Sequence, residues 1–159
     1  MTGNHFIPKV SDIEAVHVTL KIAGKQALFI LLTADGTINR LGTGSVKNQD
    51  NDLFIGVTQE PLFKRLLANL NDEMLHHLGG YDVPEQLGVP CELSIGLSFA
   101  GDDENGFGFR YGSESQGPPR EIVQFVTVAV QITDPWFHEQ KRMVGNTPSK
   151  RKRAWWKFW

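Results

Sequence analysis

Residues 16–33 read VHVTLKIAGKQALFILLT, and this stretch decides the fold class. In residues 16–22 apolar side chains alternate with polar ones, and this period of two predicts a half-buried strand. Gly24-Lys25 then predicts a two-residue hairpin turn with glycine first. Residues 27–33 are apolar on both faces, which is typical of a strand in the interior of a sheet.

The next segment predicts two more strands. Asp35-Gly36 is a strong hairpin signal and predicts a strand over residues 37–41. Because Arg40 shares a face with Ile38, we expect this strand at the edge of the sheet or at a bulge. Residues 53–57 predict a further short strand.

A second hairpin is predicted from residues 93–99 and 107–111, where apolar and small or polar residues again alternate. An acidic turn separates them. If the strands pair across the whole turn, Phe99 lies opposite Phe107, and pairs of this kind each contribute about 0.2–1 kcal/mol to a sheet.

Two helices are predicted. After a capping Thr58, apolar residues recur at helical spacing as far as Leu78, and Gly79-Gly80 can end such a helix. We interpret this segment as the main amphipathic helix. Residues 122–132 are apolar on both faces and predict a central strand, and Asp134-Pro135 predicts the start of a short C-terminal helix.

These elements predict an α+β fold. It consists of a largely antiparallel sheet of six or seven strands, with one main amphipathic helix on one face and a short C-terminal helix. The predicted organisation is an N-terminal arm over residues 1–12, a single α+β domain over 13–145 and a basic, aromatic C-terminal tail over 146–159.

Size and composition bound the class of protein. A chain of 159 residues with 40% hydrophobic content can bury a core of its own. The single cysteine, Cys91, cannot form an internal disulfide, and we interpret it as a small core residue. The N-terminus shows no signal-peptide pattern and residues 122–132 are too short to cross a bilayer, so a cytoplasmic location is expected.

Charge is distributed unevenly along the chain. Residues 1–140 contain 9 Lys or Arg and 18 Asp or Glu, for a net charge of −9. Residues 141–159 contain 7 Lys or Arg and no acid. The body therefore repels nucleic acid and anionic lipid, while the end of the chain attracts them and also attracts the body itself or a sister body.

Arg110 is the one candidate for a ligand-binding residue in the domain. In the predicted register it lies opposite Gly96 on a face of small residues that includes Ser94 and Ser98. A guanidinium above such a floor can hold a carboxylate or phosphate in a two-pronged fashion, with the serines as hydrogen-bond donors. Alternatively, the small residues allow close packing, or Arg110 pairs with an acid of its own chain.

No arrangement of residues forms a catalytic signature, and no cofactor or metal site is predicted. The adjacent His76-His77 point about 100° apart on a helix, which disfavours a shared metal and fits a favourable interaction with a helix C-terminus. These features favour a protein that is not an enzyme.

The tail is the most specific feature of the sequence. Cations and large aromatics lie close together there, namely Arg151, Lys152, Arg153, Trp155, Trp156, Phe158 and Trp159. Three kinds of partner fit: an apolar groove on this or a sister subunit, an anionic membrane surface, and nucleic-acid bases and phosphates, the last the least favoured. A disordered tail without a task is the remaining interpretation.

The leading hypothesis is a non-enzymatic binding or assembly protein whose tail docks on a protein partner or a sister subunit in a homo-oligomer. The first alternative is a protein or enzyme that binds a small anionic molecule at the Arg110 face. The second is a peripheral membrane-associated protein held by the tail.

Overall fold

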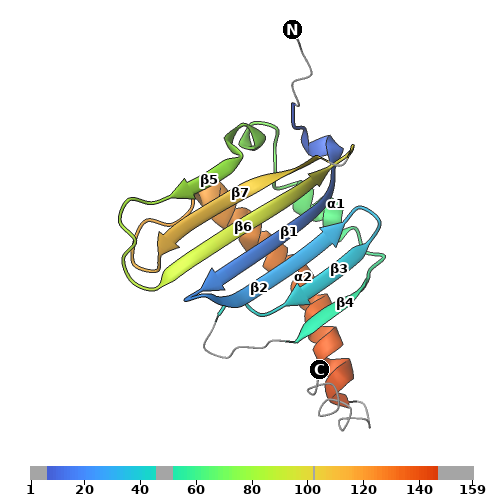
Figure 1. Ribbon diagram of the computed structural model, residues 1–159. Coiled ribbons are helices and arrows are strands. Elements are labelled where there is room, and N and C mark those ends of the chain that lie inside the picture. The colour runs from blue at the N-terminus through green and yellow to red at the C-terminus, as the bar shows by residue number, and fades with distance from the viewer. Residues whose placement is uncertain (1–6, 46–51, 102, 147–159) are drawn as a thin grey trace.

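A computed structural model describes residues 7–45, 52–101 and 103–146 of the chain. It shows an α+β fold in which one long helix crosses one face of a seven-stranded sheet (Figure 1). The strands are β1 (Ile13–Ile22), β2 (Lys25–Thr33), β3 (Thr37–Leu41), β4 (Leu53–Val57), β5 (Gly79–Asp82), β6 (Pro90–Phe99) and β7 (Asp103–Gly112). The helices are α1 (Leu62–Leu67) and α2 (Arg120–Asn146), and single 3-10 turns are η1 (Val10–Asp12) and η2 (Met74–His77).

The sheet is mixed. Its strand order is β4-β3-β2-β1-β6-β7-β5, and every neighbouring pair is antiparallel except β5 with β7, which is parallel. The predicted α+β class is confirmed, and the count of seven falls within the predicted six or seven strands, but β5 was not predicted and the predicted strand over residues 122–132 is absent from the sheet. Gly79-Gly80, expected to end a helix, instead begins this edge strand.

The first hairpin is confirmed with its turn one residue earlier than predicted. Ala23 and Gly24 form the turn with φ angles of 53° and 77°, and β2 begins at Lys25. Two positive φ values match the right-handed twist of the paired strands. β2 lies between β1 and β3, as its apolar pattern predicts.

The expected edge position of residues 37–41 is wrong. β3 lies inside the sheet between β2 and β4, and β4 is the edge strand. Ile38 and Arg40 do share a face, as the sequence indicates, and both are buried. The polar residue that suggested an edge therefore has a partner in the core.

The second hairpin forms with a tighter turn than predicted. Phe99 lies opposite Asp103 and Ile95 opposite Phe107, so the predicted pairing of Phe99 with Phe107 is wrong by four residues. A shift by an even number leaves every side chain on its expected face, and alternation alone therefore cannot distinguish the two registers.

The predicted main helix over residues 58–78 is wrong. Only Leu62–Leu67 is α-helical, and Met74–His77 forms a separate 3-10 turn. Asn69 donates its side-chain N–H to the Arg65 carbonyl, and Asn71 accepts a hydrogen bond from the Met74 amide. These local side-chain bonds offer the backbone an alternative to the helical ladder, so the helix ends after two turns.

The predicted central strand over residues 122–132 is also wrong, because this segment lies in α2. Its buried residues follow helical spacing: Ile122, Phe125, Ala129 and Ile132. Asp134-Pro135, expected to start a separate short helix, lies inside the same helix. β-branched residues raise strand propensity, but packing of this apolar stripe on the sheet decides the outcome.

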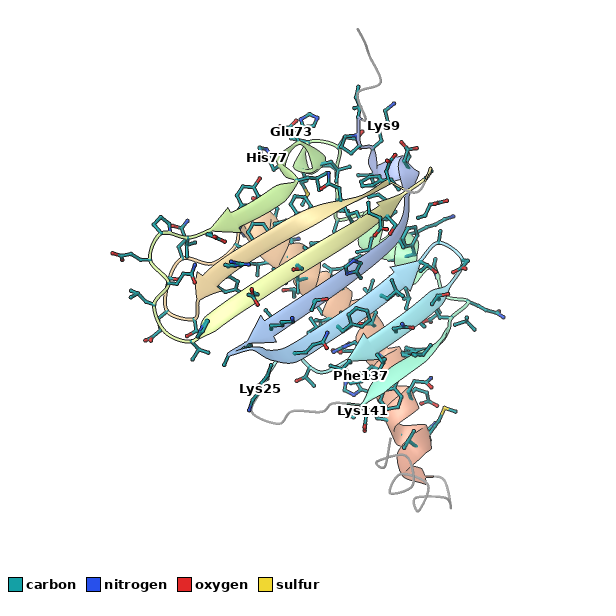
Figure 2. The ribbon with its side chains drawn as sticks, in the orientation of Figure 1. Lys9, Lys25, Glu73, His77, Phe137 and Lys141 are labelled. Atoms are coloured by element: carbon teal, nitrogen blue, oxygen red, sulfur yellow. The ribbon has the colours of Figure 1, made fainter. Side chains whose placement is uncertain are left out.

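One face of the sheet is covered and the other is open. α2 runs diagonally beneath the sheet, with α1 beside it, and together they bury the inward-facing side chains of β1, β2, β3, β6 and β7 (Figure 1). No helix among the described residues lies on the opposite face. Side chains project from that face with no described helix over them (Figure 2).

Candidate functional site

Arg110 lies on the open face, but not in the predicted surroundings. Its cross-strand partner is Glu92 rather than Gly96, and Arg110 Nε lies 3.4 Å from Glu92 Oε1. The Arg110 side chain is 64% exposed. Pairing with an acid of its own chain, one of the three interpretations above, is therefore present in the structure.

The structure brings Ser94 and Arg110 together but not Ser98. Ser94 and Arg110 line one shallow depression on the open face. Ser98 lies four residues further along β6, opposite Glu104. An anion at Arg110 would therefore meet at most Ser94 and would compete with the carboxylate of Glu92.

Close packing explains two of the small residues on this face. A Cβ at Gly96 would lie 1.9 Å from Nε2 of His17, so the imidazole of β1 occupies the space above this glycine. A Cβ at Gly106 would lie 2.2 Å from the Ile95 carbonyl oxygen. The glycines thus accommodate their own sheet neighbours, in line with close backbone approach.

A cavity of about 470 Å³ lies on the covered face, between the β5–β7 edge and the first turn of α2. Its wall is aromatic. The Tyr81 and Phe109 rings stack with centroids 5.3 Å apart, and Phe107 and Phe109 stack at 6.4 Å. Tyr111 continues the wall, and burial raises the pKa of its phenol.

Segments distant in sequence close this cavity. η2 contributes Met74 and His77 on one side, where Figure 2 labels His77 next to Glu73. The Tyr81 hydroxyl donates a hydrogen bond to the His77 carbonyl, which ties β5 to η2. The loop before α2 closes the other side with Pro118 and Pro119.

An apolar patch lies at the opposite edge of the sheet, on the open face. All three outward side chains of β4 are exposed, with Leu53 at 47%, Ile55 at 69% and Val57 at 75%. Next to Leu53 the patch continues through half-buried Leu41 and Phe29, and Leu31 lies beyond Asn39, the polar residue opposite Ile55. We call these six residues the β4 patch.

Sequence analysis found the strand but missed the patch. Residues 53–57 are apolar at every position, a pattern typical of a strand buried on both faces. Phe54 and Gly56 do face α2, where the Phe54 ring lies 5.7 Å from that of Phe137. The outward side chains have no such cover among the described residues.

Arg40 is a buried charge that joins the sheet to α2. Its NH1 donates to Thr133 Oγ1 and to Asp134 Oδ1, each at 2.9 Å, and its Nε donates to the Gly42 carbonyl at 3.1 Å. The guanidinium lies 4.4 Å from the Phe137 ring centroid. Burial lowers the pKa of Arg40, and Asp134 opposes this shift, so the cation is retained.

Geometry around Arg40 favours a structural role. Its side chain is 1% exposed, its Nε donates to the Gly42 carbonyl and its NH1 donates to side chains of α2. Phe137 is contacted on a further side by Lys141, whose Nζ lies 5.0 Å from the ring centroid (Figure 2). A ligand has no access to this cation.

Other sequence features are placed as follows. Cys91 is buried as expected, and burial raises the pKa of its thiol. His76 and His77 lie in η2 rather than in a long helix, and His76 Nδ1 lies 3.6 Å from Glu73 Oε2. Among the described residues, no three His, Cys, Asp or Glu side chains gather in a way that could hold a metal ion.

The tail candidates lie outside the described residues. They are Arg151, Lys152, Arg153, Trp155, Trp156, Phe158 and Trp159. Within the described part of the chain, no helix has an apolar stretch long enough to cross a lipid bilayer.

Comparison with known proteins adds no family. The sequence matches no protein-family model, and no curated protein shows significant similarity to it.

Proposed function

We propose that the protein is a non-enzymatic assembly protein, in which the basic aromatic tail of one subunit covers the β4 patch of a sister subunit. The observation that carries the proposal is the exposure of Leu53, Ile55 and Val57 on an edge strand. Clustered exposed apolar side chains of this kind mark an interaction site.

The β4 edge also lacks the usual protection against pairing. Exposed edge strands commonly carry a charge, a proline or a bulge that discourages association with another chain. β4 reads LFIGV, without charge or proline, and pairs with β3 in regular register along its whole length. Its outer edge can therefore accept backbone hydrogen bonds from an added segment.

The position of α2 supports the tail as the covering segment. α2 passes beneath β4, where Trp136 meets Gly56 and Phe137 meets Phe54, and then continues beyond the edge of the sheet (Figure 1). The 13 residues that follow α2 can span up to about 43 Å when extended. The tail thus begins beside the edge that carries the patch, and its aromatics match the chemistry of the patch.

Direction and charge favour a sister subunit. The last turns of α2 lead away from the sheet (Figure 1), so a tail that covered its own patch would have to reverse around β4. Reciprocal exchange of tails between two copies gives a closed two-fold dimer. Residues 1–146 carry a net charge of −7 and the 13 residues that follow carry +5, so the two attract each other in such a pair.

Light scattering coupled to size-exclusion chromatography tests this proposal on three proteins besides the full chain. They are a truncation to residues 1–146, Ile55→Lys in the patch, and Val123→Lys as a control. Val123 is also an exposed apolar residue, at 47%, but it lies on α2 away from the patch. We expect a dimer for the full chain and Val123→Lys, and a monomer for the truncation and Ile55→Lys.

A monomeric full chain, or a dimer that survives both the truncation and Ile55→Lys, would overturn the proposal. Thermal melts of all four proteins accompany the sizing, so that loss of the dimer is interpreted only for proteins that fold. Raising the salt concentration should weaken the dimer in part, because the charge attraction is screened while the apolar contact is not.

A further inference from the structure

The cavity beside β5 is independent of the proposed assembly surface. β5 and β4 are opposite edges of the sheet, about 29 Å apart by strand spacing, and the cavity lies on the covered face while the β4 patch lies on the open one. Its volume of about 470 Å³ is within the range of small-molecule sites.

The wall of the cavity suits a hydrophobic ring or a cation. Phe107, Phe109 and Tyr81 form a stack in which neighbouring rings are nearly parallel, with interplanar angles of 10° and 15°. The electron-rich faces of such rings attract flat hydrophobic groups and cations. Ile122 and Met74 add apolar contacts without hydrogen-bonding capacity.

Charged groups around the cavity favour a cation over an anion. Two carboxylates border it, and neither forms an ion pair with another described residue. Glu121 lies on the first turn of α2, whereas Asp82 alternates with Tyr81 along β5 and lies at the rim beside Arg110, towards the open face. Arg110 is the one permanent cation in the lining, but it pairs with Glu92 at 3.4 Å. His77 adds positive charge only when protonated, and Gln116 is neutral.

We infer that this cavity binds a small organic cation with a flat hydrophobic body, such as an aromatic amine. The ring stacks on the Tyr81–Phe109 wall, and the ammonium group lies next to Glu121 at the mouth of the cavity, with Asp82 at the rim. The favourable terms are burial of the ring, attraction of the cation to the aromatic faces and attraction to the two carboxylates.

Three probes with the same ring test the charge preference: tryptamine, indole and indole-3-acetate. Binding to the full chain at pH 8 is measured by isothermal titration calorimetry and ligand-observed NMR. We expect tryptamine to bind at least about threefold more tightly than indole, because the free energy of an exposed cation–π contact corresponds to about that factor in the dissociation constant. Indole-3-acetate should bind most weakly of the three.

Matched variants test the location. The double variant Asp82→Asn with Glu121→Gln should weaken the binding of tryptamine and leave that of indole unchanged, because it removes the carboxylates and keeps the aromatic wall. Phe109→Leu should weaken both probes. Glu14→Gln, an exposed carboxylate on β1, serves as the control and should change neither.

The inference is overturned if indole-3-acetate binds more tightly than tryptamine, if none of the probes binds at millimolar concentration, or if the double variant binds tryptamine as the parent does. Sizing of the same samples separates this result from the assembly proposal, because removal of the Asp82 and Glu121 charges leaves the β4 patch intact and should leave the dimer intact.

Discussion

Two regions of α2 contact the sheet in different ways. In its middle the helix is fixed by converging contacts: Arg40 bonds to Thr133 and Asp134, and Trp136 lies directly on Gly56. At its N-terminal end the helix approaches the β5–β7 edge across a cavity of about 470 Å³. One helix therefore combines a tightly packed anchor with an open site.

A stiff loop maintains the open end. Ser115 Oγ accepts a hydrogen bond from the Gly112 amide at 2.8 Å and donates one to the Gly112 carbonyl at 3.0 Å. Pro118 and Pro119, whose φ angles are fixed by their rings, then lead into the first turn of α2. The loop thus sets where the helix begins, and the cavity persists without direct packing of α2 on β5.

The anchor predicts the largest effect. Replacing Arg40 by Ala removes the guanidinium, its contact with Phe137 and its bonds to α2, and should lower the free energy of unfolding by about 3–5 kcal/mol. Arg40→Met keeps an apolar side chain beside Phe137, and its free energy of unfolding should fall by clearly less. The Asp134 side chain is 38% exposed and can be rehydrated when its partner is removed. Urea unfolding measures both.

A loss below about 1 kcal/mol for Arg40→Ala would show that the middle of α2 is not anchored by this residue. Equal losses for Ala and Met would mean that the charge and its hydrogen bonds dominate over packing of the stem. Either result would change the account of how the middle of α2 differs from its N-terminal end.

Elements that are specified by neighbouring residues could be predicted from the sequence, and elements that depend on tertiary packing could not. The β1–β2 hairpin followed from alternation and a glycine turn within 18 residues. α2 did not, because Ile122, Phe125, Ala129 and Ile132 have helical spacing within a β-branched segment, and the apolar residues between them hide it. A count of spacing at three and four residues would have found this stripe.

The candidate sites were less predictable than the fold. Arg40 could have been noticed as a charged residue on an apolar face, and its partner could then have been sought in a later helix. The cavity combines η2, β5, β7 and the start of α2, which lie together only because β5 joins the sheet beside β7. No local pattern indicates that pairing.

A substitution at Gly56 tests how tightly β4 packs on the middle of α2. A Cβ at this position would lie 2.9 Å from Cζ2 of Trp136, closer than ordinary contact, so Gly56→Ala requires the indole to shift. Overpacking of this kind costs about 1–3 kcal/mol, offset in part by the reduced freedom of the unfolded chain. We expect a net loss of about 1–2 kcal/mol by urea unfolding, and no loss would mean that Trp136 repacks freely.

Gly117→Ala is the matched substitution beside the cavity, and we expect it to have the smallest effect on the free energy of unfolding. A Cβ there would lie 3.9 Å from the Tyr111 ring, an ordinary contact, and the residue is exposed on the loop that borders the cavity. Gly117→Ala should therefore leave the free energy of unfolding unchanged or raise it by up to about 1 kcal/mol, through the unfolded state. The same glycine-to-alanine change is thus expected to lower the free energy of unfolding beside the middle of α2 and not to lower it beside the N-terminal end. A loss at Gly117 as large as that at Gly56 would mean that the N-terminal end is packed as tightly as the anchor, and the cavity would then lack the room for a ligand that its geometry indicates.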